Sequence, residues 1–132
     1  MQTIQQFLQE HPIQLTSVKV PDRTDVAWPA KGASHYACTL VYDGHHQFTY
    51  FSLGSAYRGV PSVAMVLDSL ASDAASVESC DTFADWCSEC GCDDDSRAAY
   101  RTFQACRHAA RDLKRLLGET AYTDLVSGTE RL

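Results

Sequence analysis

Residues 35–53 read HYACTLVYDGHHQFTYFSL and contain the clearest indication of the fold. The two flanks are rich in Tyr, Phe, Thr and Val, which favour β-strands. Between them, Asp43-Gly44 supplies the two positive-φ positions of a type I′ turn. The stretch therefore predicts an antiparallel hairpin of two strands, 35–42 and 45–53.

A two-residue turn also fixes which residues of the hairpin share a face, because side chains alternate along each strand. One face is then predicted to hold Tyr36, Cys38, Leu40, Phe51 and Leu53, and the other Ala37, Val41, Phe48 and Tyr50. Both faces are partly apolar. The pattern therefore leaves open which of them meets the rest of the core.

The residues before the hairpin predict a short helix, a strand and a loop. Thr3 and Gln6 match a capping box, and the helix that they begin ends before Pro12. Apolar residues within 13–20 predict a first strand. Residues 22–34 are rich in Asp, Gly, Pro and Ser and predict a loop.

Downstream of the hairpin the apolar residues change from a period of 2 to a period of 3.6, which indicates helices. Pro61 fits the first position of the first helix. Its apolar stripe comprises Val63, Val66, Leu67, Leu70 and Ala74. Thr82 is able to cap a short second helix that presents Phe83, Trp86 and Cys87.

The strongest helical pattern begins at Asp95-Ser96 and ends at Leu117, with Gly118 at the usual C-terminal stop. At about 100° per residue, six apolar side chains fall on one stripe and are predicted to be buried. These are Ala99, Phe103, Cys106, Ala110, Leu113 and Leu117. A last short helix is expected over 121–126.

The order of elements predicts one α+β domain over residues 1–132. Its small antiparallel sheet has three strands, including the central hairpin, and packs against a C-terminal helical layer. A chain of 132 residues suits a single core, and 45% hydrophobic with 21% charged residues is typical of a soluble protein. No stretch approaches the roughly 18 apolar residues of a membrane span, and no secretory signal is visible. We therefore expect a soluble, cytoplasmic protein.

Charge is distributed unevenly along the chain, whose formal net charge is −6. Between Arg58 and Arg97 there are nine carboxylates and no Lys or Arg, and we call this stretch the acidic block. The helix that follows carries six basic residues against Asp112 alone. We call its arginine-bearing face the basic stripe, which comprises Arg97, Arg101, Arg111 and Arg115.

The negative net charge argues against general binding to nucleic acid or anionic membranes. The acidic block can instead occupy a basic surface of another protein, including a channel that normally holds nucleic acid. The candidate partner-binding residues are Asp81, Asp85, Glu89, Asp93 and Asp94. A simpler alternative is that the arginines pair with the acidic block of the same chain. A third is that the basic stripe of the helix 96–118 binds nucleic acid.

Four of the six cysteines lie within thirteen residues: Cys80, Cys87, Cys90 and Cys92. Thiolates bind zinc, but a structural zinc site usually joins two separated ligand pairs, and no second pair follows nearby. We therefore expect free thiols and no metal, with a zinc site and a disulfide as the alternatives. Cys38 and Cys106 are expected to be small core residues.

The remaining polar clusters match no catalytic or metal-binding motif. Asp93-Asp94-Asp95-Ser96 lacks the alternating ligands of a calcium loop and suits the start of a helix. None of the five histidines belongs to a known motif, and no nucleophile elbow or phosphate-binding glycine loop occurs. The residues therefore predict no enzymatic activity and no cofactor.

Several segments carry a resemblance to a known group of proteins. They are HYACTL (35–40), YFSLGS (50–55), VLDSLASDA (66–74), FADWC (83–87), DSRA (95–98) and TERL (129–132). On these segments the chain resembles small proteins encoded in bacteriophages and prophages, over about residues 35–132. Such relatives often have aromatic residues after the Trp-Cys pair. This chain has Cys90 and Cys92 there, which argues against a required zinc site.

Small phage proteins without enzymatic motifs are frequently inhibitors of host defence, including anti-CRISPR proteins. The resemblance therefore implies a non-enzymatic phage accessory protein in the bacterial host cytoplasm. Its expected partner is a host defence protein, with a CRISPR–Cas effector component as the leading candidate. The alternative is a phage regulator that binds nucleic acid through the basic stripe.

Overall fold

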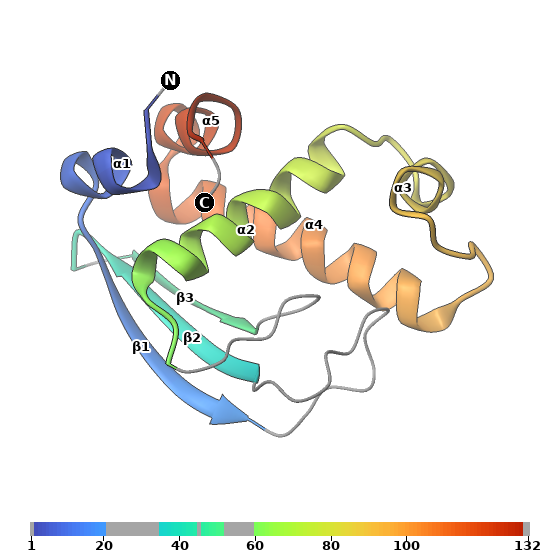
Figure 1. The fold of residues 1–132 in the computed structure, drawn as a ribbon, viewed down its shortest axis with the longest axis horizontal. Helices are drawn as coiled ribbons and strands as arrows, with labels where there is room; N and C mark the ends of the chain where they lie inside the picture. Colours follow the sequence, from blue (N-terminus) through green and yellow to red (C-terminus); the bar gives the residue numbers. More distant parts are fainter. Residues whose placement is uncertain (1, 21–34, 45, 52–59, 131–132) are drawn as a thin grey trace.

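The computed structural model describes residues 2–20, 35–44, 46–51 and 60–130, and the predicted loop 22–34 lies outside them. Its elements are α1 (Ile4–Glu10), β1 (Ile13–Val20), β2 (His35–Tyr42), β3 (His46–Phe51), α2 (Val63–Glu78), α3 (Phe83–Cys90), α4 (Arg97–Leu117) and α5 (Glu119–Gly128). The predicted α+β class is confirmed (Figure 1). In the described part, no helix is both long and apolar enough to cross a membrane.

The strands form one antiparallel sheet in the order β1-β2-β3. Residues Ile13 and Tyr42 are partners at one end of the β1–β2 ladder, and Val20 and His35 at the other. The helices cover one face of this sheet, with α2 and α4 crossing above the strands (Figure 1). The domain therefore has two layers, the sheet and the helices that pack on one of its faces.

The hairpin between β2 and β3 differs from the sequence prediction by one residue. Asp43 and Gly44 have φ values of 60° and 71°, so the two positive-φ positions are confirmed. However, Tyr42 pairs with His46, which leaves three residues in the connection instead of two. The strand consequently starts at residue 46.

This extra residue reverses the predicted pairing of faces, because a slip of one residue moves every position to the other side of a strand. Cys38 is opposite Tyr50, and Leu40 is opposite Phe48. The predicted grouping of Tyr36, Cys38 and Leu40 with Phe51 and Leu53 is therefore wrong. Positions 48 and 50 share their side of the sheet instead.

Burial shows which side of β2 meets the helices. Tyr36, Cys38 and Leu40 are buried, whereas the alternate residues of β2 are only half-buried. In β1, Ile13 is buried and Val18 is exposed. The face with Cys38 and Leu40 therefore packs against the helices and contributes to the main core.

Local capping signals explain where the helices begin. Thr3 and Gln6 form the predicted capping box of α1. α2 begins at Val63 because the Ser62 hydroxyl accepts a hydrogen bond from the Met65 N–H at 3.2 Å. Pro61 precedes this cap, so its predicted place as the first helical residue is wrong.

The long helix α4 closes the main core from above. All six side chains of its predicted stripe are buried: Ala99, Phe103, Cys106, Ala110, Leu113 and Leu117. The main core groups most of them with buried residues of α1, α2, α5 and the sheet. The two ends of the described chain also meet, because the Glu130 N–H donates to the Gln2 carbonyl at 2.8 Å.

A second, smaller apolar cluster holds α3 against α4. Its buried members are Cys80, Trp86, Cys87, Ala99 and Phe103. The Phe103 ring lies 5.5 Å from the rings of both Phe83 and Trp86, measured between centroids. The indole N–H of Trp86 donates to the Ser76 hydroxyl at 3.2 Å, which ties α3 to α2 as well. This cluster fixes the position of α3 at one end of the molecule (Figure 1).

Candidate functional site

The short helix α3 and the loop after it present most of the predicted site residues. The Thr82 hydroxyl caps α3 by accepting a hydrogen bond from the Asp85 N–H at 3.1 Å. The helix ends at Gly91, whose φ of 74° is in the left-handed region. The Cys92 N–H then donates to the Cys87 carbonyl at 3.0 Å, the helix-ending motif that glycine favours. The chain is thereby turned back toward α4.

The loop between α3 and α4 is ordered by its own side chains. Asp93 accepts a hydrogen bond from the Asp95 N–H at 3.0 Å. The Ser96 hydroxyl accepts one from the Ala99 N–H at 3.1 Å and is the N-cap of α4. The expected capping role of this run is therefore performed by Ser96, with Asp93 shaping the turn before it.

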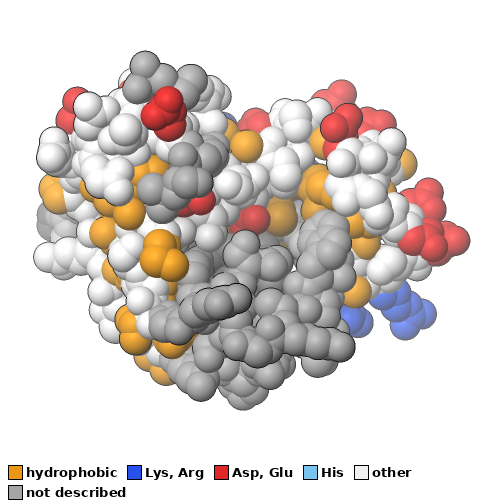
Figure 2. Space-filling model, viewed as in Figure 1, with side chains coloured by type: hydrophobic (Ala, Val, Ile, Leu, Met, Phe, Trp, Pro, Cys, Tyr) orange, Lys and Arg blue, Asp and Glu red, His pale blue; other side chains and the backbone are white. Residues whose placement is uncertain are grey.

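All five predicted partner-binding residues are exposed: Asp81, Asp85, Glu89, Asp93 and Asp94. Together with Asp95, which belongs to the acidic block but not to the candidate partner-binding residues, we call them the acidic surface. None of the six forms an ion pair with another residue in the described part of the chain. Acidic side chains gather around α3 and the loop that follows it, at the right of Figure 2. The structure therefore brings the predicted residues to one end of the molecule.

Asp81 lies at the edge of this surface and also lines a hollow between α2 and α4. That hollow has a volume of about 430 Å³ and lies between the end of α2 and the middle of α4. Its charged lining residues are Glu78, Asp81, Arg107, Arg111 and Lys114. Asp81 thus faces cations of α4 without forming an ion pair with any of them.

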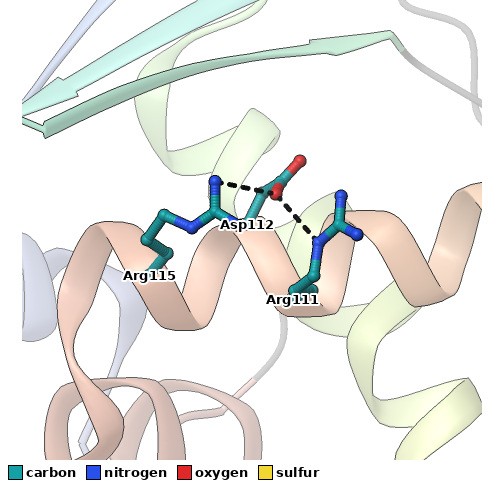
Figure 3. Close-up of polar contacts among 3 residues, drawn as sticks. All are labelled: Arg111, Asp112 and Arg115. Atoms are coloured by element: carbon teal, nitrogen blue, oxygen red, sulfur yellow. Dashed lines mark hydrogen bonds and ion pairs between the residues drawn. The ribbon is translucent and has the colours of Figure 1, made fainter.

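The basic stripe does not pair with the acidic block among the residues that the structure describes. Its ion pairs there stay within α4, where Asp112 contacts Arg111 at 3.4 Å and Arg115 at 3.9 Å (Figure 3). Two further cations of α4 lie over aromatic rings, Arg107 over Phe103 and Lys114 over Tyr122. The alternative that the arginines of the stripe form ion pairs with the acidic block is therefore wrong for the described part.

The clustered cysteines are free thiols in a poorly reactive setting. Cys80 and Cys87 are buried in the smaller cluster, and Cys90 and Cys92 are half-buried beside it. Burial raises the pKa of the Cys87 thiol above its ordinary value, and the carboxylates of Asp94 and Asp93 raise it further. A raised pKa keeps the thiol protonated and suppresses its nucleophilicity.

The geometry of possible metal ligands points to carboxylates instead of thiols. We looked in the described residues for three or more His, Cys, Asp or Glu side chains whose ligand atoms lie within 4.8 Å of one another. Asp93, Asp94 and Asp95 form the one such group there. All three residues are exposed, and such exposed acidic groups are common without a bound ion. The cysteines do not have this arrangement, so we retain the expectation of free thiols.

A second hollow of about 540 Å³ lies between the start of α4 and α3. It is lined by Phe83, Asp94, Asp95, Ser96, Arg97, Tyr100, Arg101 and Gln104, and we call it the α3–α4 hollow. The Tyr100 side chain is 46% exposed, and its ring meets Phe83 edge-on at 5.1 Å. The sequence prediction missed both aromatic residues as part of a surface. The available signal was the position of Tyr100, an aromatic residue among the arginines on the polar face of α4.

No protein family, no curated protein and no solved structure matches this chain. The resemblance to phage-encoded proteins therefore stays a prediction.

Proposed function

We propose that the protein is a non-enzymatic phage accessory protein that binds a host protein through its acidic surface and inhibits it. The leading candidate for the partner is a component of a CRISPR–Cas system, which works in the bacterial cytoplasm. This identity of the partner comes from the resemblance noted in the sequence. The mode of binding rests on the exposed charges around α3.

One observation supports the acidic surface above other parts of the molecule. Six exposed carboxylates lie around α3, and no ion pair neutralises any of them among the described residues. Like charges held together repel one another, and this repulsion falls when a basic surface of a partner binds. Proteins that hold nucleic acid present such surfaces, because they must contact phosphates.

The acidic surface is held by a helix that is firmly packed against α4, and this favours binding. α3 is anchored by Trp86 and Phe103, so its outer side chains are carried on a fixed element. A preorganised surface loses little conformational freedom on association. Exposed charges at an interface act mainly on the rate of encounter. We therefore expect fast association that slows as salt is added.

The proposal is tested with two variants that each lose three exposed charges. In one, Asp81→Asn, Asp85→Asn and Glu89→Gln remove carboxylates. In the other, Arg97→Gln, Arg101→Gln and Arg115→Gln remove guanidinium groups. Substitutions at such exposed positions cost within about 0.5 kcal/mol each, so both variants are expected to fold. Circular dichroism and a denaturation curve check this before binding is measured.

The partner is first captured from a bacterial lysate with the tagged, full-length chain and identified by mass spectrometry. Association kinetics and inhibition of target-DNA cleavage by the purified CRISPR–Cas effector are then measured. The acidic variant is expected to associate roughly tenfold more slowly, with the arginine variant little changed. If the arginine variant loses binding and the acidic variant keeps it, the proposed mechanism is wrong.

A second candidate function is supported by the state of the basic stripe. Arg97 and Arg101 are exposed, have no ion pair within the described residues and flank the exposed ring of Tyr100. Arginines beside an aromatic platform are typical of proteins that bind single-stranded nucleic acid. A phage regulator of this kind would bind a labelled oligonucleotide, and the arginine variant would lose that binding.

A further inference from the structure

The hollow between the end of α2 and the middle of α4, which we call the α2–α4 hollow, has three cations along one wall. Arg107, Arg111 and Lys114 all border it. Their spacing of four and then three residues sets them on one face of α4. From the first to the last they extend over about 10 Å of the helix. We call these three side chains the cationic wall.

Two cations of the wall are held over aromatic rings. The guanidinium carbon of Arg107 lies 5.6 Å from the centroid of the Phe103 ring. The ammonium nitrogen of Lys114 lies 5.2 Å from the centroid of the Tyr122 ring. Such a contact positions a cation and leaves its charge in place. Both charged groups are therefore positioned before a ligand arrives.

The third cation, Arg111, is engaged through one nitrogen. Its Nε contacts a carboxylate oxygen of Asp112 at 3.4 Å, and its two terminal nitrogens lie on the side away from Asp112 (Figure 3). Within the described residues, no cation of the wall forms an ion pair with a carboxylate across the hollow. The hydrogen-bonding capacity of the wall is therefore largely unused there.

The opposite wall of the hollow carries two carboxylates, Glu78 and Asp81. Glu78 accepts a hydrogen bond of 2.7 Å from the Tyr122 hydroxyl, so α5 holds it in place. Three cations against two carboxylates give this hollow a positive balance, on a chain whose net charge is −6. Like charges on successive turns of a helix repel one another, and an anion bound between them relieves this repulsion.

We propose that the α2–α4 hollow binds a small molecule that carries two linked phosphate groups. The fork of an arginine fits two phosphate oxygens, and lysine binds phosphate as a point charge. Cations spread over about 10 Å of helix suit two linked phosphates better than a single phosphate or carboxylate. The volume of about 430 Å³ is within the range of small-molecule sites. Val77 and Ala110 add an apolar part to the lining, which suits the organic part of such a compound.

Asp81 distinguishes this proposal from binding of a host protein. It belongs to the acidic surface and also lines the hollow, where its carboxylate faces the cationic wall. A carboxylate beside a bound phosphate weakens binding, because like charges repel. Removing it is therefore expected to weaken host binding and to tighten diphosphate binding. Each proposal can fail while the other holds.

Titration of the purified full-length chain with inorganic diphosphate tests the proposal, in a buffer without divalent cations. Calorimetry measures the affinity, and two-dimensional NMR of the labelled chain locates the site. One diphosphate per chain is expected, with the largest shifts in residues 77–81 and 107–114. Orthophosphate is expected to bind roughly tenfold more weakly, since it makes fewer of the charged hydrogen bonds. No binding at millimolar diphosphate, shifts centred elsewhere, or equal binding of orthophosphate overturns the proposal.

A charge-matched pair of variants tests the cationic wall. Arg107→Gln with Lys114→Gln is expected to weaken diphosphate binding by at least roughly tenfold. Arg97→Gln with Arg101→Gln removes the same charge from the same helix outside this hollow, and is expected to leave binding unchanged. All four positions are exposed, and circular dichroism checks that both variants fold. An equal loss in both variants indicates general attraction to the cations of α4 and overturns the site.

Neutralising the opposite wall gives the reverse effect. Asp81→Asn is expected to tighten diphosphate binding several-fold, because it removes a repelling carboxylate from the hollow. Asp85→Asn removes an equal charge from outside the hollow and is expected to change the affinity little. Unchanged or weaker binding by Asp81→Asn overturns the placement of the diphosphate between the two walls.

Discussion

Phe103 is the side chain that attaches α3 to α4, and its truncation is the sharpest test of the fold. It is 4% exposed, and its ring centroid lies 5.5 Å from those of Phe83 and Trp86. The guanidinium of Arg107 lies over the same ring at 5.6 Å. Replacing Phe103 by Ala removes all of these contacts together and leaves a cavity.

The expected loss follows from this burial. Truncation of a fully packed Phe to Ala costs about 3 to 5 kcal/mol in unfolding free energy. Urea lowers the stability of a small domain by about 1 to 3 kcal/mol per molar. The unfolding midpoint of Phe103→Ala is therefore expected to fall by roughly 2 M relative to the wild-type chain.

The assay is equilibrium urea unfolding, followed by circular dichroism and by tryptophan emission. The chain has two tryptophans, so Trp28→Phe leaves Trp86 as the reporter of the smaller cluster. Tyr100→Ala is the matched control, because that ring belongs to the same helix but is 46% exposed. It is expected to cost less than about 1 kcal/mol. A midpoint for Phe103→Ala as little changed as that of the control would refute the burial of this face of α4.

Three further predictions follow from the loop and the thiols. Gly91→Ala is expected to lower the free energy of unfolding by about 1 to 2 kcal/mol, because a residue with a Cβ is strained at a φ of 74°. The added Cβ meets no atom within 4 Å, so this loss comes from the backbone conformation and not from a clash. Gly128→Ala, equally open and without a positive φ, is the control in the same denaturation assay. Because the pKa of Cys87 is raised, the folded chain holds the thiol proton at a pH where the unfolded chain has lost it. The free energy of unfolding is therefore expected to fall as pH rises above about 9, and to fall less in Cys87→Ser. Denaturation curves of both chains at pH 8 and pH 10 measure this difference. Elemental analysis of the purified protein is expected to find no zinc, and one zinc per chain that is lost together with folding on chelation would contradict this.

Features that depend on a few neighbouring residues could be predicted from the sequence. The capping box of Thr3 and Gln6 and the cap of α3 by Thr82 are confirmed, because each needs only a hydroxyl placed three residues before an N–H. The buried stripe of α4 is confirmed because the helical period alone selects one face. At α2, two local signals competed, and the hydroxyl of Ser62 set the start instead of Pro61.

Features that depend on distant residues could not be predicted in the same way. For the hairpin, the sequence predicts the right turn residues but the wrong loop length, and this difference of one residue reverses the faces of its strands. The acidic surface was predicted as a run of charges. The α3–α4 hollow was not, because Phe83 and Tyr100 meet only once the smaller cluster has docked α3 onto α4. Likewise, the sequence does not reveal that Asp112 takes both arginine contacts within α4.

The contact between the two ends of the described chain has a mechanical consequence. Gln2 and Thr129 form a parallel bridge, reinforced by the bond from the Glu130 N–H to the Gln2 carbonyl and by a side-chain bond of 3.3 Å. When force pulls the two ends apart, the parallel segments slide along one another, so these bonds share the load in shear. We therefore expect them to break before α1 is pulled off the core. Under tension this small bridge is expected to resist the separation of the two ends, and in an optical trap its rupture is expected to be the first event of forced unfolding.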